Sequence, residues 1–168
     1  MQSNPEIDFE EILEKNKHKI YRICKVYAVY PIEPQDLFQE VVFQIWKSYS
    51  TFKGTAHIST WIYKISLNVC LRSKIKFDKK NSKMVRLESI QFLTPKHIPD
   101  ESEQEKYQFL RDCISSLNEG DKSIVILYLE DLSYKEIASI TGLSENHIAV
   151  KMKRIRKKLF DCITPKLN

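Results

Sequence analysis

Residues 133–160 carry the pattern that most constrains the fold, because it predicts two helices joined by a tight turn. Ser133 and Glu136 stand at the spacing of a capping box, which is typical of a helix start. Gly142 can adopt the positive φ that ends a helix, and Ser144 can cap the helix that follows. The segment is therefore expected to form a helix-turn-helix unit.

The second helix of this unit has one apolar and one basic face. At about 100° per residue, an apolar stripe is predicted at Ile148, Met152, Ile155 and Leu159. Residues 151–158 contain six basic side chains and no acid, and the whole chain has a net charge of +5. Such a helix fits the major groove of DNA, where Asn and Arg read base edges and Lys contacts phosphates. The face of this helix opposite the apolar stripe contains Asn146, His147, Val150, Lys153, Arg154 and Lys157. The alternative is that the basic residues only solvate a C-terminal helix and complement its dipole.

The rest of the chain shows helical periodicity in two separate segments. Helices are expected over residues 9–29, 36–49, 59–75, 107–117 and 124–132, with Asp8 capping the first and Ser59 or Thr60 the third. Between residues 76 and 104 the periodicity is lost and prolines interrupt the chain, which indicates a linker. We therefore expect an all-α protein of two small helical domains, residues 1–75 and 105–168, joined by a flexible linker.

Several classes of function are disfavoured by the residues that the chain lacks. With only three glycines, it has no Gly-rich loop for phosphate binding, and its four histidines show no catalytic spacing. The cysteines are Cys24, Cys70, Cys113 and Cys162, each 43 or more residues from the next. This spacing favours reduced core thiols over a metal site. We therefore expect that the protein is not an enzyme and that it binds no cofactor and no metal.

The longest apolar run, residues 124–129, is far below the roughly 18 residues that a membrane span requires. The start of the chain is acidic and lacks the basic, then apolar, pattern of a secretion signal. A cytoplasmic protein without membrane insertion is expected.

Two segments resemble regions of bacterial sigma factors. Residues 36–70 begin D-L-F-Q-E and continue through F-K-G-T-A-H-I-S-T-W, and this segment resembles sigma region 2. Residues 117–159, which include the helix-turn-helix segment, resemble sigma region 4. Two lobes with one linker are the layout of the extracytoplasmic-function (ECF) subfamily. The resemblance covers nearly the whole chain and implies a subunit that directs core RNA polymerase to promoters.

The resemblance also implies roles for individual residues. The D-L-x-Q-E…W pattern implies docking on the clamp coiled coil of the polymerase β′ subunit, through Asp36, Leu37, Gln39, Glu40 and Trp46. An acceptor-rich helix face suits a basic partner surface, although a merely solvated face gives the same pattern. The loop that follows resembles the one that captures an unpaired base of the minus-ten promoter element.

The implied minus-ten set is Phe52, Lys53, Thr55, His57, Ser59, Thr60, Trp61, Lys64, Asn68 and Arg72. Aromatic side chains such as Trp61 and Tyr63 can stack on flipped bases while nearby cations hold the strand. The alternative for Trp61 is core packing. Arg72 departs from the family, which commonly has an acidic residue there.

For the minus-thirty-five element, the implied set is Ser144, Asn146, His147, Val150, Lys151, Lys153, Arg154 and Lys157. The expected partners are core polymerase, through its β′ clamp and β flap, promoter DNA as duplex and single strand, and a cognate anti-sigma factor. One alternative function is a stand-alone helix-turn-helix regulator, and a more distant one is a protein-interaction adaptor.

Overall fold

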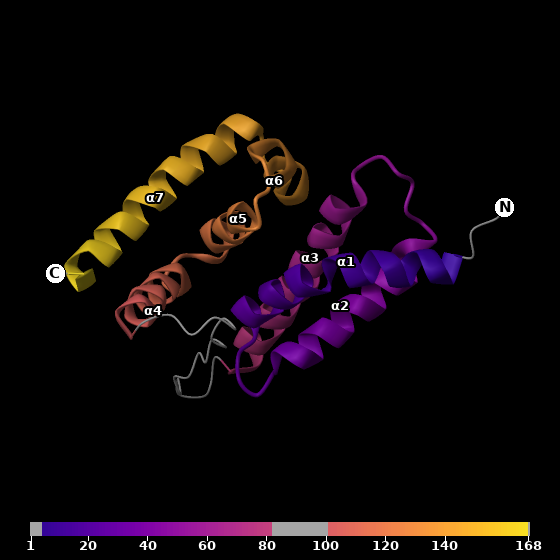
Figure 1. Ribbon diagram of the computed structural model, residues 1–168, viewed down its shortest axis with the longest axis horizontal. Coiled ribbons are helices and arrows are strands. Elements are labelled where there is room, and N and C mark those ends of the chain that lie inside the picture. The colour runs from indigo at the N-terminus through magenta and orange to yellow at the C-terminus, as the bar shows by residue number, and fades with distance from the viewer. Residues whose placement is uncertain (1–4, 82–100, 168) are drawn as a thin grey trace. The chain divides into compact units, whose positions relative to one another are not determined.

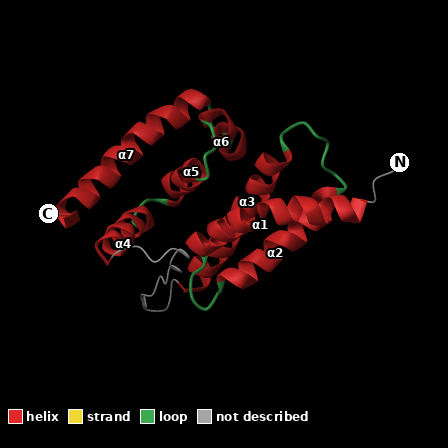
Figure 2. Ribbon diagram, in the orientation of Figure 1, coloured by secondary structure: helices red, strands yellow, loops and turns green. Residues whose placement is uncertain are grey.

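The computed structural model describes residues 5–81 and 101–167, and all regular structure within them is helical (Figures 1 and 2). The helices are α1 (Pro5–Tyr27), α2 (Pro34–Tyr49), α3 (Ile58–Asn81), α4 (Glu101–Ser115), α5 (Glu119–Leu129), α6 (Tyr134–Thr141) and α7 (Glu145–Leu167). The chain divides into two compact units, Met1–Leu93 and Thr94–Asn168, which we call the N-terminal and C-terminal units. The expected all-α fold with two domains is confirmed.

The N-terminal unit is a bundle of α1, α2 and α3 (Figure 1). Its fully buried side chains include Ile20, Ile23, Tyr27, Val41, Ile45 and Ile62. Each helix contributes apolar residues three or four positions apart, which lie on one face and pack against the other two helices. In α2 the buried residues are Leu37, Val41 and Ile45, four positions apart, which agrees with the helical periodicity of this segment.

The starts of α1 and α2 differ from expectation. Helix α1 begins at Pro5, so Asp8 lies inside the helix, where its Oδ2 accepts a hydrogen bond from Tyr49 Oη at 2.8 Å. Helix α2 begins at Pro34, where a missing N–H costs nothing because the first turn has no acceptor for it. The backbone N–H of Glu33 donates to Asp36 Oδ2 at 3.3 Å and closes the start of that helix.

Helix α3 also differs at both ends. Neither Ser59 nor Thr60 caps it, since the helix begins at Ile58 and the backbone N–H of Ser59 donates to Nδ1 of His57 at 3.4 Å. The helix continues to Asn81, so a linker from residue 76 is wrong for residues 76–81. These residues are rich in lysine, which favours helix without adding to an apolar stripe. Helix α4 likewise begins at Glu101, and the flexible linker expected between them, residues 82–100, lies outside the described residues.

The C-terminal unit contains α4 to α7 around a core that includes Ile124, Leu127, Ile137, Ile148, Met152 and Ile155. The apolar run of residues 124–129 is helical, as the flanking pattern indicated. Asn118 caps α5, because its Oδ1 accepts the backbone N–H of Asp121 at 2.9 Å. Helix α7 extends seven residues beyond the expected end at residue 160.

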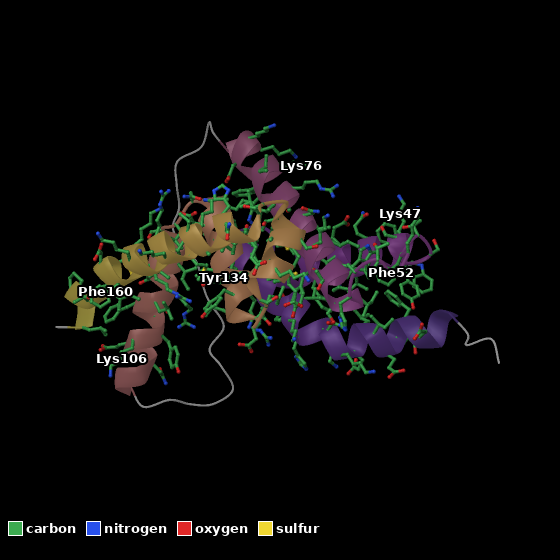
Figure 3. The ribbon with its side chains drawn as sticks, turned by 90° about the horizontal axis from the view of Figure 1, so that it is seen from above. Lys47, Phe52, Lys76, Lys106, Tyr134 and Phe160 are labelled. Carbon is green, nitrogen blue, oxygen red and sulfur yellow. A yellow bond between two sulfur atoms is a disulfide. The ribbon has the colours of Figure 1, made fainter. Side chains whose placement is uncertain are left out.

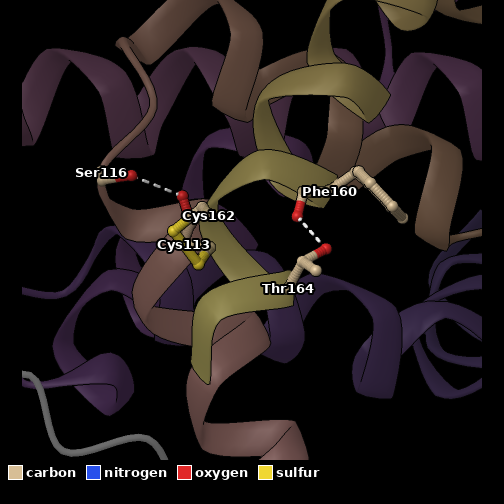
Figure 4. The surroundings of a disulfide bond; sticks show 5 residues. All are labelled: Cys113, Ser116, Phe160, Cys162 and Thr164. Atoms are coloured by element: carbon tan, nitrogen blue, oxygen red, sulfur yellow. Dashed lines mark hydrogen bonds between the residues drawn. A yellow bond between two sulfur atoms is a disulfide. The ribbon is translucent and has the colours of Figure 1, made fainter. Parts of the chain in front are cut away.

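The cysteines form two different pairs. Cys113 of α4 and Cys162 of α7 are joined by a disulfide, with 6.0 Å between their Cα atoms (Figure 4), so the expectation of a reduced thiol is wrong for both. Cys24 and Cys70 are buried free thiols, as expected, with their Sγ atoms 3.9 Å apart. Their mutual contact and burial raise the pKa of Cys70 far above its usual range. The pairing of α4 with α7 could not be foreseen, because 49 residues separate the bonded cysteines.

Candidate nucleic-acid and polymerase interfaces

The helix-turn-helix segment has the local geometry that the sequence predicts. The backbone N–H of Ser133 donates to Glu136 Oε2 at 2.8 Å, and the N–H of Glu136 donates to Ser133 Oγ at 3.3 Å. Gly142 has φ of +75°, which a side chain would strain. The N–H of His147 donates to Ser144 Oγ at 3.2 Å and caps α7. These contacts fix where α7 starts and in which direction it leaves the turn.

The face that α7 turns inward is also as predicted. Ile148, Met152 and Ile155 are buried, and Leu159 is half-buried. The opposite face is open to solvent at Asn146, His147, Val150, Lys153, Arg154 and Lys157. Ser144 is exposed in the turn. The predicted DNA-facing residues are therefore brought together on one exposed surface, with Lys151 as the exception.

Lys151 is held by a buried carboxylate on α5. Its Nζ lies 2.9 Å from Asp121 Oδ1, and Nζ of Lys158 lies 2.9 Å from Asp121 Oδ2. Asp121 is only 5% exposed. Burial alone would raise the pKa of Asp121, but hydrogen bonds and charge from Lys158 and Lys151 outweigh it and lower the pKa. In this structure Lys151 neutralises Asp121, so we drop it from the DNA-facing set.

Arg156 of the basic segment is also folded back onto its own unit. Its Nη2 donates to Tyr128 Oη at 2.9 Å and to Tyr134 Oη at 3.3 Å, and its guanidinium lies 5.2 Å from the centre of the Tyr128 ring. Figure 3 labels Tyr134 at the start of α6. Arg156 was not among the predicted DNA-facing residues, and no partner was predicted for it. The helical angle of Arg156, about 80° from Ile148, was the signal that it flanks the buried stripe.

In the N-terminal unit, an aromatic pair lies where the α2–α3 loop meets α3. Phe52 (labelled in Figure 3) and Trp61 have ring centres 5.0 Å apart, tilted by 45°, and both are half-exposed. Gly54 turns this loop with φ of +67°. Tyr63, which the sequence offered as a second stacking platform, is buried, and Nζ of Lys19 lies 5.8 Å from its ring centre. Trp61 is thus the aromatic of α3 that is accessible at this site.

The remaining minus-ten candidates lie along α3 and in the loop that precedes it. Trp61, Lys64, Asn68 and Arg72 recur every three or four residues along α3 and therefore share a face. Exposed side chains in the set are Lys53, Thr55, His57, Lys64, Asn68 and Arg72, whereas Ser59 is half-buried. Thr60 is buried, so we drop it from the set.

The outer face of α2 combines acceptors with exposed aromatic surface. Asp36, Gln39 and Glu40 are exposed, and Gln44 Nε2 donates to Glu40 Oε1 at 2.9 Å. Trp46 is 48% exposed and packs edge-on against Phe9 at 4.9 Å. Leu37 is buried and belongs to the core of the bundle.

Phe43, which sequence reasoning missed, is 56% exposed on the same side of α2 as Gln39 and Glu40, one turn further along. The signal was available, because Phe43 is an apolar residue that falls outside the four-residue spacing of Leu37, Val41 and Ile45.

Both units match models of a known protein family. The family model described as Sigma-70 region 2 matches residues 12–76, and that of Sigma-70, region 4 matches residues 108–159. Together they account for well over half of the chain, one in each unit. This chain belongs to the sigma-70 family.

Individual relatives agree with this assignment. RNA polymerase sigma factor SigV of Bacillus subtilis is 29% identical over 145 residues, which are 84% of this chain and 82% of that protein. The ECF RNA polymerase sigma factor SigW of the same organism is 22% identical over 161 residues, 90% of this chain and 86% of that one. The chain is an ECF sigma factor, and its function is promoter-directed transcription initiation.

A solved structure shows the same fold. Sigma factor RpoE of Bartonella quintana, crystallised with the anti-sigma factor NepR, superposes with a TM-score of 0.79 over 92% of this chain and 96% of that one, at 18% identity. Among the described residues of this sigma factor, no helix is long and apolar enough to cross a membrane. No group of three or more acidic, histidine or cysteine side chains there is placed to hold a metal.

Proposed function

We propose that the sigma factor divides promoter recognition between its two units. Residues 1–75 bind core polymerase and open the minus-ten element, and residues 105–168 bind the minus-thirty-five element. The observation that carries this proposal is the exposed face of α7, which contains Asn146, Arg154 and Lys157. This helix is the second of a helix-turn-helix unit, and an α-helix is narrow enough to enter the major groove of DNA. Asn and Arg can form paired hydrogen bonds to base edges, whereas Lys is a mobile point charge suited to phosphates.

The minus-ten function rests on the Phe52–Trp61 pair and the cations along α3. Opening a duplex breaks the stacking between bases, so the protein must provide an aromatic surface on which an unpaired base can stack instead. Trp61 supplies that surface, and Phe52 backs it at 5.0 Å. Lys53, Lys64 and Arg72 are exposed and can hold the backbone of the separated strand.

Core polymerase binding is assigned to the outer face of α2. Its acidic and amide groups, Asp36, Gln39 and Glu40, border an aromatic surface formed by Phe43 and Trp46. An exposed apolar patch with a polar rim is typical of a protein interface, and the acidic rim suits a basic partner. We assign this face to the β′ clamp, and the C-terminal unit to the β flap.

Other parts of the proposal concern the setting in which the factor works. It acts in the cytoplasm, where it meets core polymerase, and it catalyses no reaction of its own and needs no cofactor. A cognate anti-sigma factor is expected to hold it inactive, since the similar protein RpoE was crystallised with the anti-sigma factor NepR.

The test uses holoenzyme assembled from core polymerase and the full chain on a promoter fragment selected by the wild-type holoenzyme. Permanganate reactivity of thymines near the start site reports strand opening, and a gel shift reports closed-complex binding. Holoenzyme with Trp61→Ala should lose strand opening and keep closed-complex binding. Trp61→Phe, which retains a stacking ring, should keep most of the strand opening.

A Trp61→Ala protein that opens the promoter like wild type would overturn the melting role. Loss of cooperative thermal unfolding would instead show that Trp61 packs the core.

A further inference from the structure

A single carboxylate holds two lysines of the DNA-facing helix. Lys151 and Lys158 each bind one oxygen of Asp121 at 2.9 Å. Seven residues of helix are about 20° short of two full turns, so these two lysines lie on the same flank of α7, about 10.5 Å apart along its axis. Two contacts this far apart on one flank resist both rotation and tilting of the helix.

Asp121 is itself fixed in place. Its backbone N–H donates to Asn118 Oδ1 at 2.9 Å, and Nδ2 of Asn118 donates to Asp121 Oδ2 at 3.0 Å. It stands in the first turn of α5, and it is buried. The carboxylate is therefore an anchor that belongs to the core, whereas the lysines reach it from the edge of α7.

Arg156 holds the other flank of the helix through the hydroxyls of Tyr128 and Tyr134. The six basic residues of the segment 151–158 thus divide equally. Lys151, Arg156 and Lys158 bind groups of their own unit, and Lys153, Arg154 and Lys157 are exposed on the face opposite the buried stripe. This division is a property of the packing, because the three cations bound to their own unit are interspersed in sequence with the other three, and Arg156 and Lys158 make their contacts while exposed to solvent.

We propose that Asp121 is a positioning residue that sets the rotation of α7 and withdraws Lys151 and Lys158 from DNA phosphates. This inference rests on the proposed function of α7 as the DNA-contacting helix. Phosphate contacts raise affinity for any sequence alike, whereas base contacts discriminate. By holding two lysines and offsetting part of their charge, Asp121 limits sequence-independent binding and leaves recognition to the residues on the outward face.

Neighbouring lysines provide a matched test. Lys157 and Lys158 are adjacent and chemically identical, but Lys157 is on the outward face and Lys158 is bound to Asp121. Each is changed to Gln in the full chain, and holoenzyme binding to a labelled promoter fragment is titrated at a series of salt concentrations. Core polymerase contributes equally to every variant, so differences in the salt slope report α7.

The expected results differ for the two lysines. Lys157→Gln should reduce the slope of log K against log salt by about one unit, because one phosphate contact is lost. Lys158→Gln should leave the slope unchanged. Asp121→Asn, which keeps the size of the side chain and removes its charge, should steepen the slope by about one to two units. It should also strengthen binding to a fragment with a scrambled upstream element, so that discrimination falls.

Each contrary outcome has a separate meaning. If both glutamine variants reduce the slope equally, Lys158 contacts DNA and the proposed role of Asp121 is wrong, although α7 remains the DNA-binding helix. If neither changes the slope, α7 does not hold DNA and the proposed function of the C-terminal unit fails. An unchanged slope in folded Asp121→Asn also overturns the inference. Should that variant fail to unfold cooperatively, Lys151→Gln replaces it, with the same unchanged slope expected as for Lys158→Gln.

Discussion

Asp121 lies below the surface of the C-terminal unit and faces cations from another helix. Lys151 and Lys158 approach it from α7, Asn118 donates to it from the turn before α5, and Lys122 on its own helix is bound to Glu119 instead. The lysines hold the pKa of Asp121 below its usual range in the folded state. A carboxylate whose pKa is lower when folded stabilises the fold above its unfolded pKa and loses that contribution as the pH falls.

This coupling predicts how Asp121→Asn depends on pH. At neutral pH the variant should lower the free energy of unfolding by about 1 to 3 kcal/mol, because two ammonium groups lose a charged acceptor. The difference from wild type should stay constant down to about pH 5, and shrink below about pH 4, where the carboxylate becomes protonated in the unfolded chain and then in the folded one. Urea unfolding across this range measures it.

Asp131→Asn, at an exposed turn residue, is the matched control and should show no such pH dependence. A deficit for Asp121→Asn that persists unchanged at pH 3 would contradict the account.

At the scale of the helix, capping signals succeeded for α6 and α7 but failed for α1 and α3, where Asp8 and Ser59 or Thr60 do not cap. The starts of α6 and α7 were predictable, because Ser133, Glu136, Gly142 and Ser144 act within a few residues of themselves. The end of α3 was not predictable from apolar periodicity, because its last turns are lysine-rich and contribute little to the core. The contacts of Lys151 and Lys158 with Asp121 also escaped prediction, since Asp121 lies 30 and 37 residues from the lysines it binds.

The exposed face of α7 gives a prediction about base readout. Arg154→Ala should weaken holoenzyme binding to the selected promoter by about 1 to 3 kcal/mol and relax the preference at one or two upstream positions. Binding to a fragment with a scrambled upstream element should change little, because a base contact is not made there. Competition titrations on the two fragments measure both effects. Equal weakening on both fragments would show that Arg154 only contacts phosphates.

The disulfide between α4 and α7 gives a prediction about the stability of the C-terminal unit. In oxidising buffer, Cys162→Ser should lower the free energy of unfolding by about 2 to 4 kcal/mol, because the bond that restricts the unfolded chain is lost. With a thiol reductant present, wild type and Cys162→Ser should become nearly equal. The difference in stability between Cys70→Ser, at a free buried thiol, and wild type should be the same with and without the reductant, because both proteins contain the Cys113–Cys162 bond. A Cys162→Ser deficit that is the same in both buffers would contradict a disulfide role.

For the whole molecule, the two units are separate structures with separate cores. Region 2 matches the three-helix unit and region 4 matches the helix-turn-helix unit. The sequence was sufficient to predict these two units, because each has its own helical periodicity and the intervening segment does not. The exposed aromatic surface of α2 was not predicted, since Phe43 differs from a core phenylalanine only in its helical angle. A sigma factor of this organisation should need core polymerase to engage a promoter.

A gel shift of the selected promoter fragment with the full chain, in the presence and absence of core polymerase, distinguishes a sigma factor from a regulator that binds DNA alone. We predict a sequence-specific shift only when core is present. We also predict loss of that shift, with unchanged helical content, when Asp36 and Glu40 are both changed to Lys on the exposed face of α2. The account would be contradicted if the chain alone bound the fragment as tightly and as specifically as it does with core polymerase.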